Sequence, residues 1–130
     1  RIWEKELLVT TQYIKNNVVF VCEEQGEVVA YYSVVNITED RNISGIAISQ
    51  GYWLDHMFVS PPFIGSGFGR QMFAHLCDWC LVKAIEKVHI LADPNARDFY
   101  DKMGCVYQRE YPSTIPERTT PLLLLRITGQ

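Results

Sequence analysis

The sequence feature that most constrains the fold is a glycine-rich turn between a predicted strand and a predicted helix. Residues 52–59 are apolar and β-prone, and Ser60-Pro61-Pro62 ends this run because proline cannot donate to a strand ladder. The turn that follows is Ile64-Gly65-Ser66-Gly67-Phe68-Gly69-Arg70. Residues 68–84 then place their apolar side chains on one face of a helix. A strand, a tight turn and a long helix in this order indicate a domain that mixes strands with helices.

The chemistry of this turn favours an anion site. Glycine lets a backbone adopt positive φ and come close to a ligand. The start of a helix offers unpaired N–H groups and the positive end of its dipole, which together suit phosphate, and Arg70 adds a cation. The Walker ending Gly-Lys-Ser/Thr is absent, and the glycine spacing is G-x-G-x-G rather than that of the dinucleotide fingerprint. A tight turn that binds nothing is the alternative at this point.

The remaining sequence predicts a mixed, mostly antiparallel sheet flanked by helices on both faces, in one domain over residues 1–130. Because Arg1 stands inside an apparent helix, we expect an upstream element to be missing. The predicted elements are a helix over 2–15, a hairpin of strands 18–22 and 28–35, a loop over 36–50 with 43–48 extended, a strand at 88–92, a helix from Asp93 to Met103 ended by Gly104, strands at 105–110 and 122–127, and an irregular connection over 111–121.

Composition narrows the class of partner. Apolar residues make up 48% of the 130 residues, enough for a substantial core. The net charge is −3, from 12 basic and 15 acidic residues, which argues against nucleic acid as the main partner. We find no apolar run of membrane-spanning length and no signal peptide, so we expect no membrane association.

The four cysteines include a C-x-x-C pair, Cys77 and Cys80. A redox or zinc pair is one interpretation of this spacing, but no second pair follows at zinc spacing. We therefore expect packed free thiols, no metal and a reducing, cytoplasmic location.

Two blocks resemble the GCN5-related N-acetyltransferase superfamily. The first is Leu54–Pro61 followed by Ile64–Arg70, which is similar to the family's acetyl-CoA motif after a strand; the second, Asp93–Cys105, is similar to its Asn-containing helix with a Phe-Tyr pair. The proline-containing segment 112–118 is also similar to some members, and the resemblance extends over about residues 17–127. It departs at Ile64, where the family prefers Gln or Arg, at Cys105, where Phe is usual, and in the family's first strand and helix, which are absent or shortened.

The resemblance implies acetyl-CoA as the acyl donor, with backbone N–H groups of residues 65–70 on its pyrophosphate. A backbone N–H of Phe58 or a neighbour would polarise the thioester carbonyl. Asn95 would bind the pantetheine arm, its alternative being an ordinary polar residue at a helix start. The implied cofactor-binding residues are Met57, Phe58, Val59, Ile64, Gly65, Ser66, Gly67, Phe68, Gly69, Arg70, Asn95, Phe99 and Lys102.

For catalysis the resemblance indicates Tyr100 as the proton donor to the leaving thiolate. A phenol titrates near ~10 and a thiol near ~8.5, so a phenol can donate to a nascent thiolate; the alternative is a core tyrosine with its hydroxyl at the surface. Asp55 and His56 are candidate bases, and strand alternation would send them to opposite faces, so that at most one faces the acceptor. We treat His75 and His89 as structural.

Together these observations predict an acetyl-CoA-dependent N-acetyltransferase that acts on a primary amine of a small molecule or peptide. The first alternative is a non-catalytic acyl-CoA-binding module of the same fold, and the second is an interaction domain that binds no nucleotide. A homodimer is compatible with the resemblance.

Overall fold

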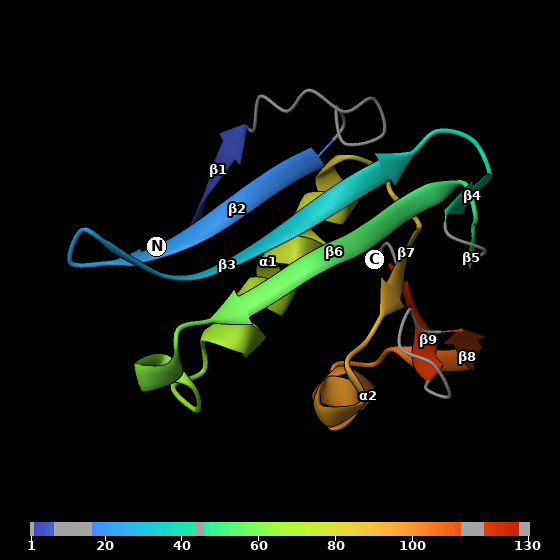
Figure 1. Ribbon diagram of the computed structural model, residues 1–130. Helices are drawn as coiled ribbons and strands as arrows, with labels where there is room; N and C mark the ends of the chain where they lie inside the picture. Colours follow the sequence, from blue (N-terminus) through green and yellow to red (C-terminus); the bar gives the residue numbers. More distant parts are fainter. Residues whose placement is uncertain (1, 7–16, 44–45, 113–118, 128–130) are drawn as a thin grey trace.

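The computed structural model describes residues 2–6, 17–43, 46–112 and 119–127. Its centre is a seven-stranded sheet in the order β1-β2-β3-β6-β7-β9-β8 (Figure 1). All neighbouring strands are antiparallel except β6 and β7, which are parallel. The strands of this sheet are β1 (Ile2–Glu6), β2 (Asn17–Glu24), β3 (Glu27–Ile37), β6 (Gly51–Val59), β7 (Lys87–Leu91), β8 (Val106–Pro112) and β9 (Thr119–Arg126).

Helices follow the two parallel strands. After β6 come a 3-10 turn, η2 (Pro61–Phe63), and the long helix α1 (Phe68–Val82). After β7 come a second 3-10 turn, η3 (Pro94–Ala96), and the short helix α2 (Arg97–Lys102). The predicted strand, glycine turn and long helix are therefore confirmed.

The prediction of a helix over residues 2–15 is wrong for residues 2–6. These residues form β1, which pairs antiparallel with β2, so that Trp3 lies opposite Val21. On the side away from β3, the eight-residue strand β2 offers a row of backbone groups for pairing, and pairing with it overrides a local helical pattern. The rest of the predicted helix, residues 7–15, lies outside the described residues, as do residues 113–118 of the predicted irregular connection over 111–121. The two ends of that connection are instead strand, since residues 111–112 belong to β8 and residues 119–121 to β9.

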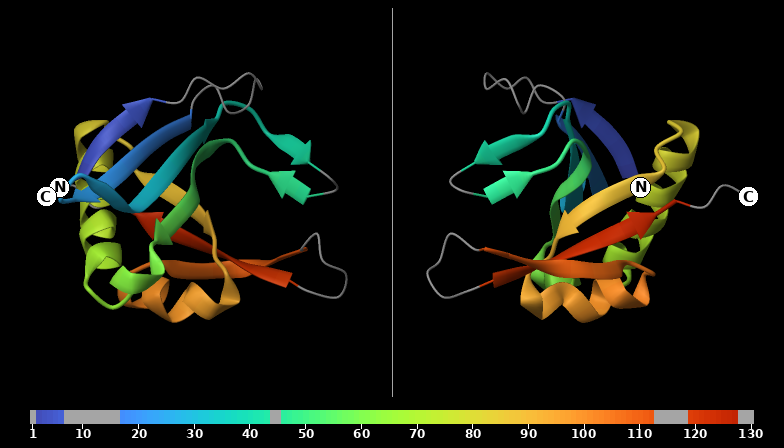
Figure 2. Two further views of the ribbon diagram at one scale, coloured as in Figure 1. Left: turned by 60° about the vertical axis from the view of Figure 1, so that its left-hand side comes forward. Right: turned by 90° about the vertical axis from the view of Figure 1, so that its right-hand side faces the viewer.

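The expected loop over residues 36–50 contains a small separate hairpin. Strand β3 continues to Ile37, and a two-stranded sheet of β4 (Arg41–Ile43) and β5 (Ile46–Ile48) then precedes β6. Figure 2 shows this hairpin projecting from the end of the main sheet where β3 ends and β6 begins. The Trp53 indole N–H donates to the Ser49 carbonyl at 2.8 Å, which fastens the end of the hairpin connection to β6.

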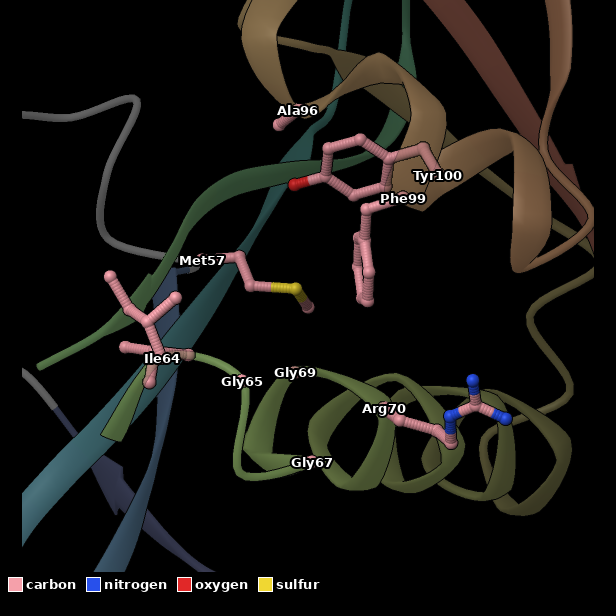
Figure 3. A pocket seen from close by; sticks show the side chains of 10 residues that line it. Met57, Ile64, Gly65, Gly67, Gly69, Arg70, Ala96, Phe99 and Tyr100 are labelled. Carbon is pink, nitrogen blue, oxygen red and sulfur yellow. The ribbon is translucent and has the colours of Figure 1, made fainter. Parts of the chain in front are cut away.

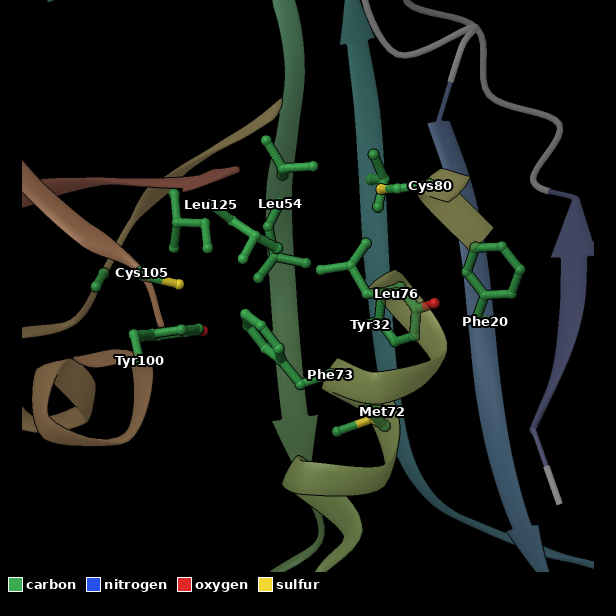
Figure 4. Packing of buried hydrophobic residues seen from close by; sticks show 14 of the residues in the cluster. Phe20, Tyr32, Leu54, Met72, Phe73, Leu76, Cys80, Tyr100, Cys105 and Leu125 are labelled. Atoms are coloured by element: carbon green, nitrogen blue, oxygen red, sulfur yellow. The ribbon is translucent and has the colours of Figure 1, made fainter. Parts of the chain in front are cut away.

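The hydrophobic core lies between the sheet and the helices. The apolar side chains on one face of α1, spaced three and four residues apart, are buried against the sheet. Figure 4 shows four of them, Met72, Phe73, Leu76 and Cys80. Tyr100 of α2 belongs to the same cluster. A smaller cluster on the other face of the sheet consists of Val35, Ile37, Trp53, Tyr111 and Leu122. The predicted class, a central mixed sheet with helices, is confirmed; in the described part of the chain both α-helices contribute to the larger cluster.

The cysteines are free thiols packed into this framework. Cys22, Cys80 and Cys105 are buried and Cys77 is half-buried. Burial is the main cause that raises the pKa of Cys80 and of Cys105 to about 12, so both remain protonated at neutral pH. The described residues contain no group of three or more potential metal ligands. None of the helices in the described ranges has the length and apolarity needed to span a membrane.

Candidate functional site

The site begins where β6 separates from β7. Their parallel pairing joins residues 52–54 of β6 to residues 88–90 of β7, although β6 continues to Val59. The ladder with β3 shifts at the same point: Ser33 pairs with His56 and Val34 with Leu54, so Asp55 is the extra residue of a β-bulge. A bulge bends the strand that carries it. The second half of β6 is therefore paired with β3 alone.

This separation leaves backbone donors of β6 facing an opening. The Ser60 N–H donates to the Val29 carbonyl at 2.8 Å, so the amide of residue 60 points toward β3. Amide directions alternate along an antiparallel strand, which points Phe58 toward β3 as well and points Met57 and Val59 to the open side. Sequence reasoning placed the carbonyl-polarising donor at Phe58 or a neighbour; the geometry favours the neighbours.

The start of α1 is the second part of the site. Its N-cap, Gly67, has φ 88° and makes no side-chain cap, and the first turn carries no acidic residue. The first bond of the helix runs from the Gln71 N–H to the Gly67 carbonyl at 3.0 Å. The N–H groups of residues 68–70 precede that bond and so have no intrahelical partner. Ser66 differs, because its N–H donates to the Phe63 carbonyl at 3.1 Å.

Arg70 adds an unpaired cation to this helix start. Its side chain is exposed, lines the pocket and makes no ion pair or hydrogen bond with any other described residue. A cation in the first turn opposes the helix dipole and costs stability. A helix start that has neither a side-chain cap nor an acid and carries an arginine has the donors and the charge that suit an external anion.

These elements enclose a pocket of about 470 Å³, within the size range of small-molecule sites. Figure 3 shows it between β6, the glycine turn and α2. Ile64, 69% exposed, contributes an apolar wall where the family prefers a polar side chain. The lining residues are Met57, Val59, Ile64, Gly65, Gly67, Gly69, Arg70, Ala96, Phe99 and Tyr100.

One glycine sets the distance between the two helices. A Cβ atom at Gly69 would lie 3.3 Å from two ring atoms of Phe99. Contacts this short are tighter than ordinary van der Waals distances, so the missing side chain lets α2 pack against the first turn of α1. The same approach brings the Phe73 ring to 6.3 Å from the Tyr100 ring.

Tyr100 presents its hydroxyl to the pocket from the inner side of α2 (Figure 3). The residue is 8% exposed, and burial, with smaller contributions from Cys105 and Asp93, raises the pKa of Tyr100 to about 12. The hydroxyl makes no hydrogen bond with another described residue. The phenol is therefore protonated at neutral pH and free to donate a hydrogen bond to a ligand.

Asp55 and His56 lie together on the side of β6 that faces away from the pocket. The His56 Nε2 atom is 3.5 Å from the Asp55 Oδ2 atom, with 64% and 42% of the two side chains exposed. The expectation that strand alternation separates them is wrong, because the bulge interrupts the alternation. Leu54 and Met57 pack against the larger core cluster, so both intervening side chains face away from it.

Other predicted site residues lie apart from the pocket. The side chains of Asn95 and Lys102 are exposed and do not line it. Phe58 packs on Tyr31 on the face of the sheet away from the pocket, with 5.5 Å between ring centroids. Phe68 is buried in the core. Sequence reasoning missed Ala96, although its spacing of three and four residues from Phe99 and Tyr100 places it on the same helical face.

The two histidines treated as structural have partners within the fold. The Nδ1 atom of His75 is hydrogen-bonded to the hydroxyl of the fully buried Tyr32. His89 stacks on Trp53 with 4.7 Å between ring centroids, and burial, more than the nearby Lys87, lowers the pKa of His89. Neither histidine lines the pocket.

Several solved structures share this fold at low sequence identity. The ribosomal-protein-S18-alanine N-acetyltransferase from Escherichia coli is 16% identical with a TM-score of 0.66, over 89% of this chain and 72% of that chain. Tetrahymena GCN5 is 14% identical with a TM-score of 0.67, over 88% and 70%. The CoA-dependent acyl-homoserine lactone synthase BjaI is 15% identical with a TM-score of 0.73, over 92% and 63%. At these identities the likeness concerns the fold.

Sequence comparison is more specific about the family. A search of curated protein sequences finds no match. The model of the acetyltransferase (GNAT) family, however, matches residues 2–105, which include β6, the glycine turn, α1 and α2. The chain belongs to the acetyltransferase (GNAT) family.

Proposed function

We propose that this protein is an N-acetyltransferase that uses acetyl-CoA to acetylate a primary amine of a small molecule or peptide. The observation that carries the proposal is one pocket with two ends. At one end lie the uncapped amides of α1 and the unpaired Arg70; at the other lies the buried hydroxyl of Tyr100. The free thiols fit a reducing compartment such as the cytoplasm.

The pocket fits the donor in charge and polarity. The pyrophosphate would accept from the amides of residues 67–70, with Arg70 as counter-cation. The pantetheine arm is narrow and largely apolar, and Met57, Val59 and Phe99 offer it an apolar channel. The amide of Val59, which points to the open side of β6, matches an amide group of that arm as an added strand would.

Acetyl-CoA supplies an acetyl group activated as a thioester. Of the two amides on the open side of β6, that of Met57 lies nearer the bulge and would stabilise negative charge on the thioester oxygen, which leaves the Val59 amide to bind the pantetheine arm. Tyr100 would stabilise the departing sulfur as a proton donor in a hydrogen bond, because a phenol with a pKa of about 12 keeps its proton at neutral pH and can share it with the developing thiolate.

The acceptor would approach from the face of β6 that carries Asp55 and His56. An amine must lose a proton to attack a carbonyl, and a histidine held beside a carboxylate is suited to receive it. The two side chains lie on the opposite face of the strand from the pocket lined by Met57. The strand would thus separate the donor from the acceptor and let them meet where β6 leaves β7.

A second candidate is a non-catalytic module that binds acyl-CoA. The exposed Ile64 favours it, because a side chain that the family often uses to hold the cofactor is apolar in this chain. Binding would then rest on backbone amides and Arg70. Both candidates would bind acyl-CoA, but only the first would transfer the acyl group.

The test measures binding and turnover separately. Thermal unfolding with acetyl-CoA at 100 times its dissociation constant should show about 2.7 kcal/mol of added stability. Release of CoA thiol in the presence of amines then reports transfer. Arg70→Ala removes the proposed counter-cation and should reduce the stability that acetyl-CoA adds. Its matched control is Arg126→Ala, in an exposed arginine of β9 that lies opposite Lys87 in the strand register, at the far end of β7. Stabilisation without thiol release would favour the binding module; no stabilisation would contradict both candidates.

A further inference from the structure

The acceptor face of β6 carries an aromatic pair that the reaction itself does not need. Phe58 is 47% exposed although it lies on a strand of the central sheet. Its ring packs on Tyr31, the residue directly opposite on β3, with 5.5 Å between centroids and 36° between planes. The side of the Phe58 ring that Tyr31 does not cover faces solvent, which makes it an exposed apolar platform.

This aromatic platform, Tyr31 and Phe58, lies next to the proposed acid–base pair. Phe58 and His56 are two residues apart on β6, so their side chains share a face and stand roughly 7 Å apart along the strand. Across the ladder, Tyr31 and Ser33 occupy the matching positions on β3. The face therefore has an aromatic end and a polar end within the length of one small molecule.

The polar end also holds a hydroxyl with no partner. Ser33 is 2% exposed, lies opposite His56, and its Oγ atom makes no hydrogen bond in the described structure. A buried hydroxyl normally has a partner, because leaving it unpaired costs free energy. The Ser33 hydroxyl is itself buried, so it adds a polar group to the His56 end of this face without being a contact that a ligand reaches directly.

We infer that the acceptor is a hydrophobic primary amine, whose amino group lies at Asp55 and His56 and whose apolar body lies on the platform of Tyr31 and Phe58. The inference rests on the proposed function. A ring or short alkyl chain two or three bonds from the nitrogen spans the roughly 7 Å between the two ends. A hydroxylated amine or a polyamine would place polar groups against the apolar ring of Phe58.

The test compares two acceptors that share an aminoethyl group, 2-phenylethylamine and ethanolamine. Acetyl transfer should favour 2-phenylethylamine by about tenfold or more in kcat/KM, and Phe58→Ala should lower the ratio of the two kcat/KM values about tenfold, which is about 1.4 kcal/mol. The loss should appear in KM, because the platform binds the body of the substrate in ground and transition states alike. Phe58→Leu, which keeps an apolar side chain, should retain part of the preference.

Val106→Ala removes an equally exposed apolar side chain from the edge strand β8 and should leave the ratio unchanged. Melting temperatures of all variants report whether they fold. Transfer without preference for 2-phenylethylamine, or an equal loss for both amines in Phe58→Ala, would overturn this inference and leave the proposed function standing. Preference for a peptide N-terminus or for spermidine would overturn it as well. Absence of stabilisation by acetyl-CoA would remove the proposed function, and this inference with it.

Discussion

Two helix starts follow two neighbouring parallel strands in this protein, and they are built in opposite ways. After β7, the Asp93 side chain accepts from the Asn95 N–H at 2.8 Å, and α2 has Asp98 in its first turn. After β6, α1 begins at a glycine with no side-chain cap and no acid, and it carries Arg70 in that turn. Both starts are preceded by proline-containing 3-10 turns. The helical segment after β7 thus begins with a side-chain cap at η3, although α2 itself has Ala96 at its N-cap and no side-chain cap, whereas neither η2 nor α1 has a side-chain cap.

The difference indicates a division of roles between the two helices. An open, uncapped start with a cation costs the free protein stability but suits the proposed anion site, whereas the cap at η3 stabilises the turn that leads into α2. α2, which continues directly from the capped turn η3, carries Tyr100, the proposed proton donor, whose hydroxyl must then be placed accurately. We therefore expect changes on α1 to affect cofactor binding and changes on α2 to affect turnover or stability.

The largest expected effect is a loss of turnover, caused by a change on α2. Tyr100→Phe removes the proposed proton donor and should lower kcat about a hundredfold or more. The dissociation constant of acetyl-CoA should change less than about twofold, because the hydroxyl acts on the departing sulfur. Steady-state kinetics and calorimetry measure the two quantities. Tyr107→Phe, in an exposed tyrosine of β8, is the control, and unchanged turnover in Tyr100→Phe would exclude this residue as the acid.

Arg70→Glu makes the start of α1 resemble that of α2. A carboxylate in the first turn suits the dipole and should stabilise the free protein by about 0.5 kcal/mol. The same change repels pyrophosphate and should weaken acetyl-CoA about thirtyfold, or about 2 kcal/mol. Compared with the wild type, the variant should therefore have a higher melting temperature without ligand and a smaller increase in melting temperature when acetyl-CoA is added. Arg126→Glu is the matched charge reversal, and equal weakening by both variants would indicate a general effect of net charge.

Gly67→Ala tests the backbone of the open start. Gly67 has φ 88°, and no atom lies within 4 Å of a Cβ built there, so any loss comes from backbone strain alone. The free energy of unfolding should fall by about 1–2 kcal/mol. Gly67→Asn should cost less, since asparagine tolerates this region better. Chemical denaturation measures both variants, and a smaller loss for alanine than for asparagine would argue against the strain.

The smallest effect is expected from a change at Asp93, the N-cap of η3. Asp93→Ala removes the cap on Asn95 and should lower the free energy of unfolding by about 1 kcal/mol. The affinity for acetyl-CoA should stay within about twofold of wild type, because the cap does not reach the pocket. Asp93→Asn keeps an acceptor oxygen and should recover most of the stability. A loss of affinity comparable to that of Arg70→Glu would remove the division of roles.

The parts of this structure that sequence predicts best are those with local signals. Glycines and prolines mark both turns, and the apolar period marks α1, so these elements follow from neighbouring residues. Residues 2–6 form a strand because of a partner more than ten residues away in sequence, which a local pattern cannot reveal.

The site shows the same limit in detail. The bulge at Asp55 is a property of the pairing with β3 and β7, so neither its position nor the approach of Asp55 to His56 is visible along the chain. Likewise, family resemblance assigns Asn95 to the cofactor, yet the structure leaves its side chain exposed and outside the pocket lining. Patterns locate elements and turns, whereas register decides which side chains meet.

The most direct test of the central claim is a ¹H–¹⁵N NMR titration with acetyl-CoA that follows the backbone amides of Gly65, Gly67 and Gly69. If the open start of α1 holds the pyrophosphate, these resonances shift and saturate with the dissociation constant found by calorimetry, while the Asn95 amide, already bonded to Asp93, shifts little. Saturating acetyl-CoA that leaves the three glycine amides in place, or moves the Asn95 amide more than them, would contradict the account.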